Sequence, residues 1–348
     1  MKIHLVSGGC GFVGRNIVKR LYQTTKDTIL FIDNLSTGAP PNAWLDVEQV
    51  GENKDIAIFG AAERLLFLKA DFRNFLAAMM ANPKYLQEKY GLVDQQFSDV
   101  FHFAALGDNC PINKDPIKIG LNLAVDADFF YWVTQHQPER ILYASASDIS
   151  TTTTPATEVA TGFRESLIDS IGNSNNIYAW SKLTGEYLAR ITAQHYGLSV
   201  TCIRLFMTYG GDQGLAAPIP AMAARIARKE DPLLVIETSQ QRSDFIHIED
   251  VLDGIFKAMA VVKDGTAINL GSGQLTSFIE IIHTLCTIGD YEPTIKQTLD
   301  KPPNRNRTYA KLAHTKEKLD WTPKISLEDG LIEIYQTALE RERAAEVV

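Results

Sequence analysis

Gly8-Gly9-Cys10-Gly11-Phe12-Val13-Gly14 is the stretch that decides the fold, because it joins an apolar run to an amphipathic one. The run before it predicts a strand over Ile3–Ser7, and the run after it predicts a helix over Gly11–Thr24. Glycines at positions 8, 11 and 14 permit a tight turn, close approach of a pyrophosphate, and tight packing of helix on strand. The N–H groups at the start of the helix would bind that pyrophosphate.

Asp33 completes this pattern at the end of a second apolar run, Ile29–Asp33. A carboxylate there is placed to accept hydrogen bonds from the adenosine ribose hydroxyls and to repel a 2′-phosphate. The unit therefore predicts NAD rather than NADP as the cofactor. The alternative interpretation is a glycine-rich turn followed by a capping aspartate.

Strand and helix patterns alternate along the first two hundred residues, which predicts an α/β fold with a doubly wound parallel (Rossmann) sheet. We expect 1–206 to form the NAD-binding domain, and 34–64 to be a loop with a short helix. The further strands are expected at Leu65–Ala70, Val100–Ala104, Arg140–Ser145 and Ser199–Phe206, and the further helices at Phe72–Tyr90, Leu121–Gln137 and Tyr178–Tyr196.

The mixed pattern of residues 207–348 predicts a smaller, interleaved α/β domain that binds the substrate, with 240–265 returning to the first domain. Its elements are expected at Ala217–Arg228, Leu233–Ile236, Asp244–Val261, Ala267–Leu270, Ser277–Ile288 and Leu327–Arg341.

Composition excludes several classes of function. The 348 residues carry a net charge of −8 without a long basic run, so no nucleic-acid partner is expected. The four cysteines lack metal-ligand spacing, so neither a metal site nor a disulfide framework is predicted. Without a leader or a long apolar stretch, we expect a cytoplasmic protein with no membrane partner.

Tyr178 and Lys182 stand four residues apart at the start of a predicted helix, so they share one face. An ammonium group near a phenol favours the phenolate and makes it a general base. Asp71, after the third strand, would reach the adenine amino group or cap the next helix. His102 ends the fourth strand and is expected to be a packed core histidine.

Six stretches, in order and over essentially the whole chain, resemble the motifs of the extended short-chain dehydrogenase/reductase family, in particular its NAD-dependent nucleotide-sugar epimerases and dehydratases. DNLSTG is most similar to UDP-hexose 4-epimerases. The stretches are GGCGFVG, DNLSTG (Asp33–Gly38), HFAA (His102–Ala105), YAWSKLTGE (Tyr178–Glu186), RSDFIHIEDV (Arg242–Val251) and NLGSG (Asn269–Gly273).

This resemblance implies Tyr178 as catalytic base, Lys182 as ribose ligand, and a nucleotide-diphospho-sugar oxidised transiently at carbon four. It also implies a homodimer that packs through helices Leu121–Gln137 and Tyr178–Tyr196. The cofactor-binding residues that it implies are Gly8, Gly11, Phe12, Val13, Gly14, Asp33, Asn34, Ser36, Thr37, Gly38, Asp71, Phe72, Phe103, Ala104, Ala105, Asn122, Tyr178 and Lys182.

The fifth strand departs from the family pattern, because Ala146 occupies the usual Ser/Thr position beside the substrate. Ser145 and Ser147 flank it, and we expect Ser147 to take over that role; both hydroxyls otherwise satisfy backbone groups. Asp148 aligns with the second acid of the sugar 4,6-dehydratases and would act as a general acid, or cap the loop.

Substrate contacts depart as well. Met207 replaces the family asparagine, and Arg242 lies one residue before the usual arginine position. Arg305 and Arg307 are the candidates to supply charge to the diphosphate. Leu106 and Cys110 are assigned to the border of the sugar pocket.

The sequence leaves three functions open. The first is a nucleotide-sugar epimerase, and the second is a 4,6-dehydratase that uses Asp148. The third is a non-catalytic regulator that binds NAD or a nucleotide sugar, which Ala146 and the altered phosphate contacts suggest and which Tyr178 and Lys182 oppose.

Overall fold

The computed structural model describes residues 2–92, 97–106, 116–149, 176–236, 242–298 and 309–346. The described residues divide into two compact units. The first unit draws on Met1–Ile149, Ser174–Arg204 and Ile255–Ile268, and the second on Leu205–Gly254 and Asn269–Val348.

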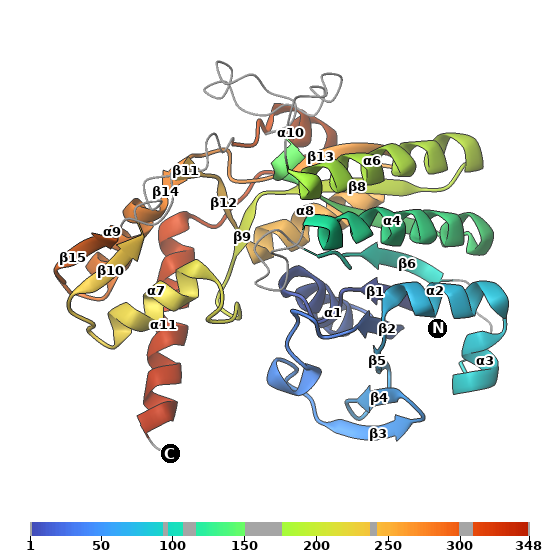
Figure 1. Ribbon diagram of the computed structural model, residues 1–348, viewed down its shortest axis with the longest axis horizontal. Coiled ribbons are helices and arrows are strands. Elements are labelled where there is room, and N and C mark those ends of the chain that lie inside the picture. Colours follow the sequence, from blue (N-terminus) through green and yellow to red (C-terminus); the bar gives the residue numbers. More distant parts are fainter. Residues whose placement is uncertain are drawn as a thin grey trace. The chain divides into compact units, whose positions relative to one another are not determined.

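The first unit is built on a sheet in the order β13-β8-β7-β6-β1-β2-β5-β4-β3 (Figure 1). Strands β1, β2, β5, β6 and β7 pair in parallel, which confirms the doubly wound sheet. The chain leaves β1 in one direction through β2 and β5, and in the other through β6 and β7. The strand order therefore reverses between β1 and β6, the place where such sheets bind ligands. The parallel strands are β1 (Ile3–Ser7), β2 (Thr28–Asp33), β5 (Leu65–Lys69), β6 (Phe97–His102) and β7 (Arg140–Ala146), and the sheet ends in β8 (Val200–Leu205) and β13 (Asp264–Leu270).

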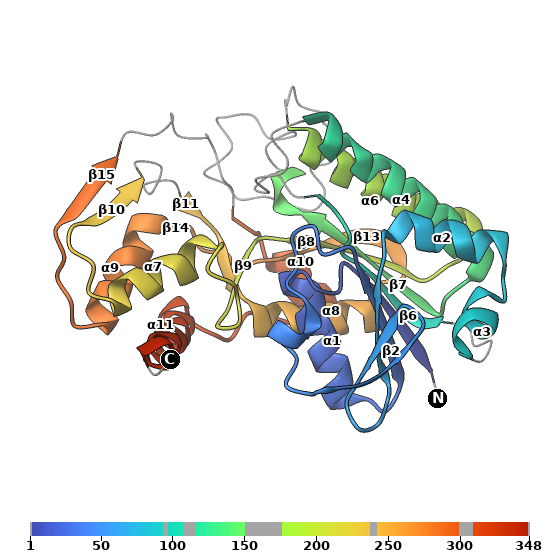
Figure 2. The same cartoon turned by 60° about the horizontal axis from the view of Figure 1, so that its bottom comes forward.

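Helices cover both faces of this sheet. Helices α2, α4 and α6 lie on one face and α1 on the other (Figure 2). No helix in the described ranges is long and apolar enough to cross a membrane. The helices are α1 (Phe12–Thr24), α2 (Phe72–Ala81), α3 (Tyr85–Tyr90), α4 (Pro116–His136) and α6 (Ile177–Tyr196), with a 3₁₀ turn η3 (Ser147–Ile149) before α6.

Two expectations for the first unit were wrong in detail. The helix predicted over Phe72–Tyr90 is broken into α2 and α3, because Asn82 is extended at φ −141° and precedes Pro83. Residues 34–64 hold not only a short 3₁₀ turn, η1 (Pro41–Ala43), but also strands β3 (Gln49–Asn53) and β4 (Ile56–Phe59). Strand β4 pairs antiparallel with β5 and buries Ile56 and Phe59, so it extends the sheet at this edge.

The second unit packs helices α7, α9 and α11 around one apolar core. Small strand pairs accompany them: β9 with β12 and β10 with β15 in parallel, and β11 with β14 antiparallel. The elements are β9 (Met207–Tyr209), α7 (Pro218–Ala227), β10 (Leu233–Ile236), β11 (Arg242–Ser243), β12 (Phe245–His247), β14 (Thr276–Ser277), α9 (Phe278–Ile288), β15 (Ile295–Thr298), α10 (Ala313–Leu319) and α11 (Leu327–Glu346).

The segment that returns to the first unit is Ile255–Ile268, later than the predicted 240–265. It begins inside helix α8 (Ile248–Val261). The earlier residues stay in the second unit because Asp244 is bound there. Its carboxylate accepts hydrogen bonds from the N–H groups of Ser272 (2.6 Å), Gly273 (2.9 Å) and Ala310 (2.9 Å).

Gly185 allows α6 to lie close to the sheet, since a Cβ at this position would overlap the hydroxyl group of the buried Tyr143. We expect Gly185→Ala to lower the free energy of unfolding by about 1–3 kcal/mol, the usual cost of overpacking. Urea unfolding measures this change.

Gly120→Ala is the matched control, because this glycine also lies in a helix, α4, and a Cβ there has no described atom within 4 Å. Alanine should stabilise that position by about 0.5–1 kcal/mol. Equal stabilities of the two variants would contradict the role given to Gly185.

Candidate active site

The glycine-rich turn between β1 and α1 has steric reasons for its glycines. Gly8 adopts φ +67°, and a Cβ on it would lie 2.8 Å from the backbone nitrogen of Ala104. A Cβ on Gly14 would overlap the carbonyl oxygen of Gly8. Gly11 is the N-cap residue of α1 and has no side chain to cap it, so the helix start is left to a ligand.

Asp33 holds this turn from the end of β2. Its carboxylate accepts hydrogen bonds from the N–H groups of Cys10 (3.0 Å) and Leu35 (2.8 Å). Burial raises the pKa of Asp33, whereas the N–H groups of Leu35, Cys10 and Gly11 lower it. A carboxylate has about four lone-pair sites, so these three donors leave room to accept a ribose hydroxyl.

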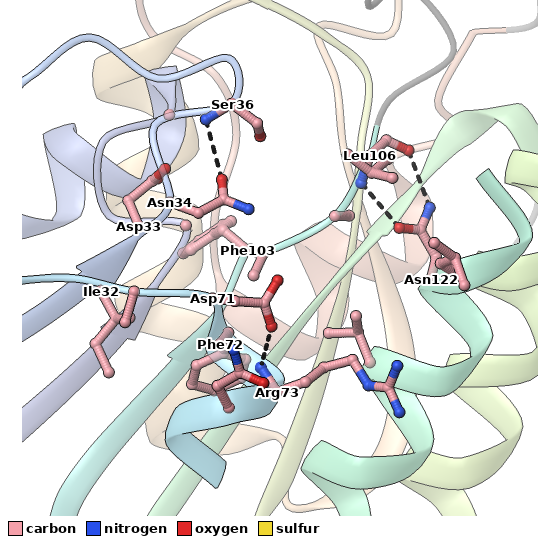
Figure 3. A pocket seen from close by; sticks show the side chains of 18 of the residues that line it. Ile32, Asp33, Asn34, Ser36, Asp71, Phe72, Arg73, Phe103, Leu106 and Asn122 are labelled. Atoms are coloured by element: carbon pink, nitrogen blue, oxygen red, sulfur yellow. Dashed lines mark hydrogen bonds between the residues drawn. The ribbon is translucent and has the colours of Figure 1, made fainter. Parts of the chain in front are cut away.

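A pocket of about 630 Å³ opens beside Asp33, within the first unit (Figure 3). Of the predicted cofactor residues, it is lined by Gly8, Gly11, Asp33, Asn34, Ser36, Thr37, Asp71, Phe72, Phe103, Ala104, Ala105 and Asn122, together with Leu106. Other predicted ligands are not among its lining residues: Phe12, Val13, Gly14, Gly38, Tyr178 and Lys182. The small side chains of Ala104 and Ala105 and the backbone of 103–105, with the glycine turn opposite, form a cradle that fits a dinucleotide.

Asp71 caps the following helix, which is one of the two roles that the sequence allowed. Its Oδ1 accepts the N–H of Arg73 at 2.9 Å and so caps α2, and the residue also lines the pocket (Figure 3).

Sequence reasoning missed the wall of the pocket that α2 and α4 supply. Helical spacing is the signal that would have found these side chains, because residues three, four and seven apart share one helix face. They are Arg73, Asn74 and Ala77 of α2 and Leu121, Val125 and Asp128 of α4.

Asn122 fixes the backbone at the other end of the pocket. Its side-chain amide accepts the N–H of Leu106 at 2.8 Å and donates to the carbonyl oxygen of Leu106 at 2.9 Å (Figure 3). This paired contact holds the chain after β6 as a neighbouring strand would. Asn122 is 1% exposed, so the contact is shielded from water.

Helix α6 places Tyr178 in its first turn, where the side chain of Asn176 caps the helix by accepting the N–H of Ala179 at 3.1 Å. Lys182 lies one turn later, and its Nζ is 5.8 Å from the ring centroid of Tyr178. The same Nζ donates to the carbonyl oxygen of Ala144 at 2.8 Å. Tyr178 and Lys182 are thus close together beside the end of β7.

Lys182 is buried, with 3% of its surface exposed, and burial lowers the pKa of its ammonium group. The nearby groups Asp126, Cys202 and Glu186 raise that pKa again. Negative charge in the surroundings therefore decides how well Lys182 stays protonated at neutral pH.

Ser145 has a structural partner. Its hydroxyl group donates to Glu186 at 2.6 Å, and Glu186 in turn accepts two hydrogen bonds, of 2.8 and 2.9 Å, from Arg204. All three side chains are buried. The Ser145 hydroxyl is therefore engaged in a contact that holds α6 against the sheet. Ser147, half-buried in η3, is the better candidate to bind the substrate hydroxyl.

Asp148 is also half-buried in η3, which packs against α6. His102, by contrast, is a core residue with 1% exposure, as expected. Its ring stacks on Phe129 with 4.2 Å between the centroids, and burial lowers its pKa.

The remaining predicted substrate contacts are placed only in part. Met207 lies half-buried in β9, where its N–H donates to the carbonyl oxygen of Asp244 at 3.0 Å. Arg242 is exposed and forms an ion pair of 3.2 Å with Glu280. Cys110, Arg305 and Arg307 lie outside the described residues.

Known proteins similar to this chain share its fold and its length. The chain is 25% identical over 340 residues to the UDP-glucuronate 4-epimerase of Thermodesulfobacterium geofontis, with 95% of this chain and 94% of that protein covered. It is 22% identical over 334 residues to UDP-glucuronic acid decarboxylase 6 of Arabidopsis thaliana, with 94% and 86% covered.

Solved structures show the same architecture. The UDP-glucose 4-epimerase of Thermotoga maritima, with UDP-glucose, superimposes with a TM-score of 0.73 at 22% identity, covering 99% of this chain and 100% of that one. The dTDP-glucose 4,6-dehydratase DesIV of Streptomyces venezuelae, solved with NAD, gives 0.78 at 20% identity, covering 99% and 98%. Residues 4–271 match the sequence profile of the NAD dependent epimerase/dehydratase family. The chain therefore belongs to this family, whose cofactor is NAD.

Proposed function

We propose that this protein is a nucleotide-sugar 4-epimerase in which Tyr178 is the catalytic base. The observation that supports this most directly is the placement of Lys182, a buried cation, 5.8 Å from the ring centroid of Tyr178. Burying a cation costs free energy, and here the cation has a use, because its charge favours loss of the phenolic proton of Tyr178. The 4-epimerase among its sequence relatives supports the same reaction.

NAD would be held by the glycine-rich turn, by Asp33 and by the residues that line the pocket. When bound, NAD supplies a hydride acceptor that returns the hydride, so no net oxidation occurs. The protein's part is to orient its substrate and to move a proton. Tyr178 takes the proton of the sugar hydroxyl at carbon four and gives it back, and Ser147 orients that hydroxyl.

Lys182 favours the phenolate of Tyr178 by its positive charge. Its remaining N–H donors are suited to the ribose hydroxyls, because an ammonium group has three donors and Ala144 uses one.

A 4,6-dehydratase is the second candidate function. Asp148 favours it, because this carboxyl group is half-buried in the turn that packs against α6, the helix of Tyr178. In that reaction Asp148 would act as the general acid for loss of the hydroxyl group at carbon six.

Tyr178→Phe should lower kcat by about 10²–10⁴-fold, because it removes the proton acceptor and leaves the ring in place. The assay is NMR analysis of products from a panel of UDP-, dTDP-, GDP- and CDP-sugars. Tyr196→Phe, at an exposed position of the same helix, should retain activity. If no nucleotide sugar turns over, or if Tyr178→Phe leaves the cellular function intact, a non-catalytic binding role gains instead.

Asp148→Asn separates the two reactions. If the protein is an epimerase, this variant should keep epimerase activity within about threefold, because that reaction does not use the Asp148 carboxyl group and asparagine has nearly the same shape. Neither form should then give the alkaline absorbance of a 4-keto-6-deoxy sugar. If that absorbance is present with the parent protein and lost with Asp148→Asn, the dehydratase assignment replaces the first one.

We further propose a homodimer that forms through α4 and α6, which lie side by side (Figures 1 and 2). Both helices expose large side chains, with Tyr131 62% and Tyr187 60% exposed. Light scattering should give twice the chain mass of 38.7 kDa. Tyr187→Glu should shift the mass toward the monomer, whereas Val50→Glu on β3 should not; a monomeric parent protein at micromolar concentration contradicts the proposal.

A further inference from the structure

Four buried polar side chains form a hydrogen-bonded row that leads from the pocket wall to α6. Ser7 ends β1, His102 ends β6, Asp126 lies in α4, and Tyr143 lies in β7. None is more than 2% exposed. The proposed reaction uses none of them directly, and a buried carboxyl group such as Asp126 is costly unless it is paired.

Hydrogen bonds give this row a direction. The hydroxyl group of Tyr143 donates to Oδ2 of Asp126 at 2.6 Å, and Nε2 of His102 lies 3.1 Å from Oδ1. An ionised carboxylate accepts both contacts, so Nε2 is the nitrogen that bears the proton in a neutral imidazole. Nδ1 then accepts the hydroxyl proton of Ser7 at 2.7 Å, and the N–H of Ala104 in the pocket wall points to Ser7 Oγ at 3.4 Å.

The other end of the row reaches the catalytic helix. Nζ of Lys182 is 5.0 Å from the ring centroid of Tyr143, within the range of a cation–π contact. Donation of the phenolic proton to Asp126 adds electron density to the ring that Lys182 faces. Tyr143 thus lies between an anion and a cation and contacts both.

Charge balance singles out Asp126 among the groups that face Lys182. These groups are Tyr178 and Glu186 on α6, Tyr143 on β7, Cys202 on β8, His102 on β6 and Asp126 on α4. Glu186 is already paired with Arg204 through two hydrogen bonds. Burial raises the pKa of Tyr143 and of Cys202 and lowers that of His102, so these three side chains are neutral at pH 7. Asp126 is the anion that balances Lys182.

We propose that Asp126 is a positioning residue of the active site, which holds Lys182 as an ammonium ion through Tyr143 and fixes the pocket backbone at Ala104 through His102 and Ser7. Its catalytic consequence rests on the proposed function. Without Asp126, Lys182 would lose its proton at a lower pH, and Tyr178 would lose the cation that favours its phenolate.

The test is a pH titration of Lys182 in the full chain, labelled with [ε-¹³C]lysine and studied without substrate. The Cε resonance is assigned with Lys182→Arg and followed from about pH 7 to pH 11. In Asp126→Asn the midpoint should fall by about one unit or more, because a nearby buried charge is removed. Asp126→Thr, close in shape and neutral, replaces Asp126→Asn if that variant does not fold.

Asp99→Asn is the matched control, because Asp99 is also a buried carboxylate of the first unit. It contacts Arg140 through hydrogen bonds of 2.6 and 2.9 Å. Its removal should leave the Lys182 midpoint unchanged. An unchanged midpoint in the neutral Asp126 variants, or an equal shift in Asp99→Asn, overturns the inference.

Turnover supplies a second measurement. In the neutral Asp126 variants the alkaline limb of the kcat/KM profile should move to lower pH by the same amount as the Lys182 midpoint. A merely structural role would lower activity evenly across pH and leave the limb in place, which overturns the inference. Absence of nucleotide-sugar turnover would refute the proposed function. The role of Asp126 would still be decided by the titration midpoint of Lys182, because that measurement needs no substrate.

Discussion

The burial of the Lys182 ammonium group is the constraint on which the active site depends. A cation removed from water is unstable unless neighbouring groups accept its hydrogen bonds and balance its charge. The carbonyl oxygen of Ala144 accepts one hydrogen bond, and this contact joins α6 to the end of β7. Because α6 also bears Tyr178, the interaction that satisfies the cation places the phenol beside it.

Close backbone packing is the second constraint, and it shapes the cofactor side. Gly8 lies so near the backbone of Phe103 and Ala104 that β1 and β6 form one continuous wall at their carboxyl ends. Asp33 joins that wall to β2 by accepting the N–H of Cys10. The amide of Asn122 then fixes Leu106 at its far end. Fixed backbone is what a dinucleotide requires, since its phosphates are bound mostly by N–H groups.

The sequence predicted the parts of this fold that depend on local pattern. Strand β1 and the glycine turn were predicted because hydrophobic period and glycine spacing are local properties. Strands β3 and β4 were missed because they gain their stability from pairing at a sheet edge, which is not visible in a short window.

The site shows the same division. Asp33 was predicted from a motif and lines the pocket, whereas Arg73 and Asp128 were missed, because their place at the pocket depends on how α2 and α4 pack. Ser145 was considered for catalysis because of its position beside Ala146. Its contact with Glu186 follows from the packing of α6 on β7, and so only the structure reveals it.

Two buried acid–base arrangements of different geometry lie at α6, the helix that bears Tyr178 and Lys182. Glu186 and Arg204 meet directly, in the forked geometry that neutralises both charges and gives a rigid support. Asp126 and Lys182 act on each other across the ring of Tyr143, without taking up the N–H donors of the ammonium group. A direct pair would hold Lys182 more firmly but would occupy the donors that we propose for the ribose of the cofactor. The indirect arrangement keeps the charge and leaves donors available, which explains why a carboxylate is buried at a position where an apolar side chain would cost less.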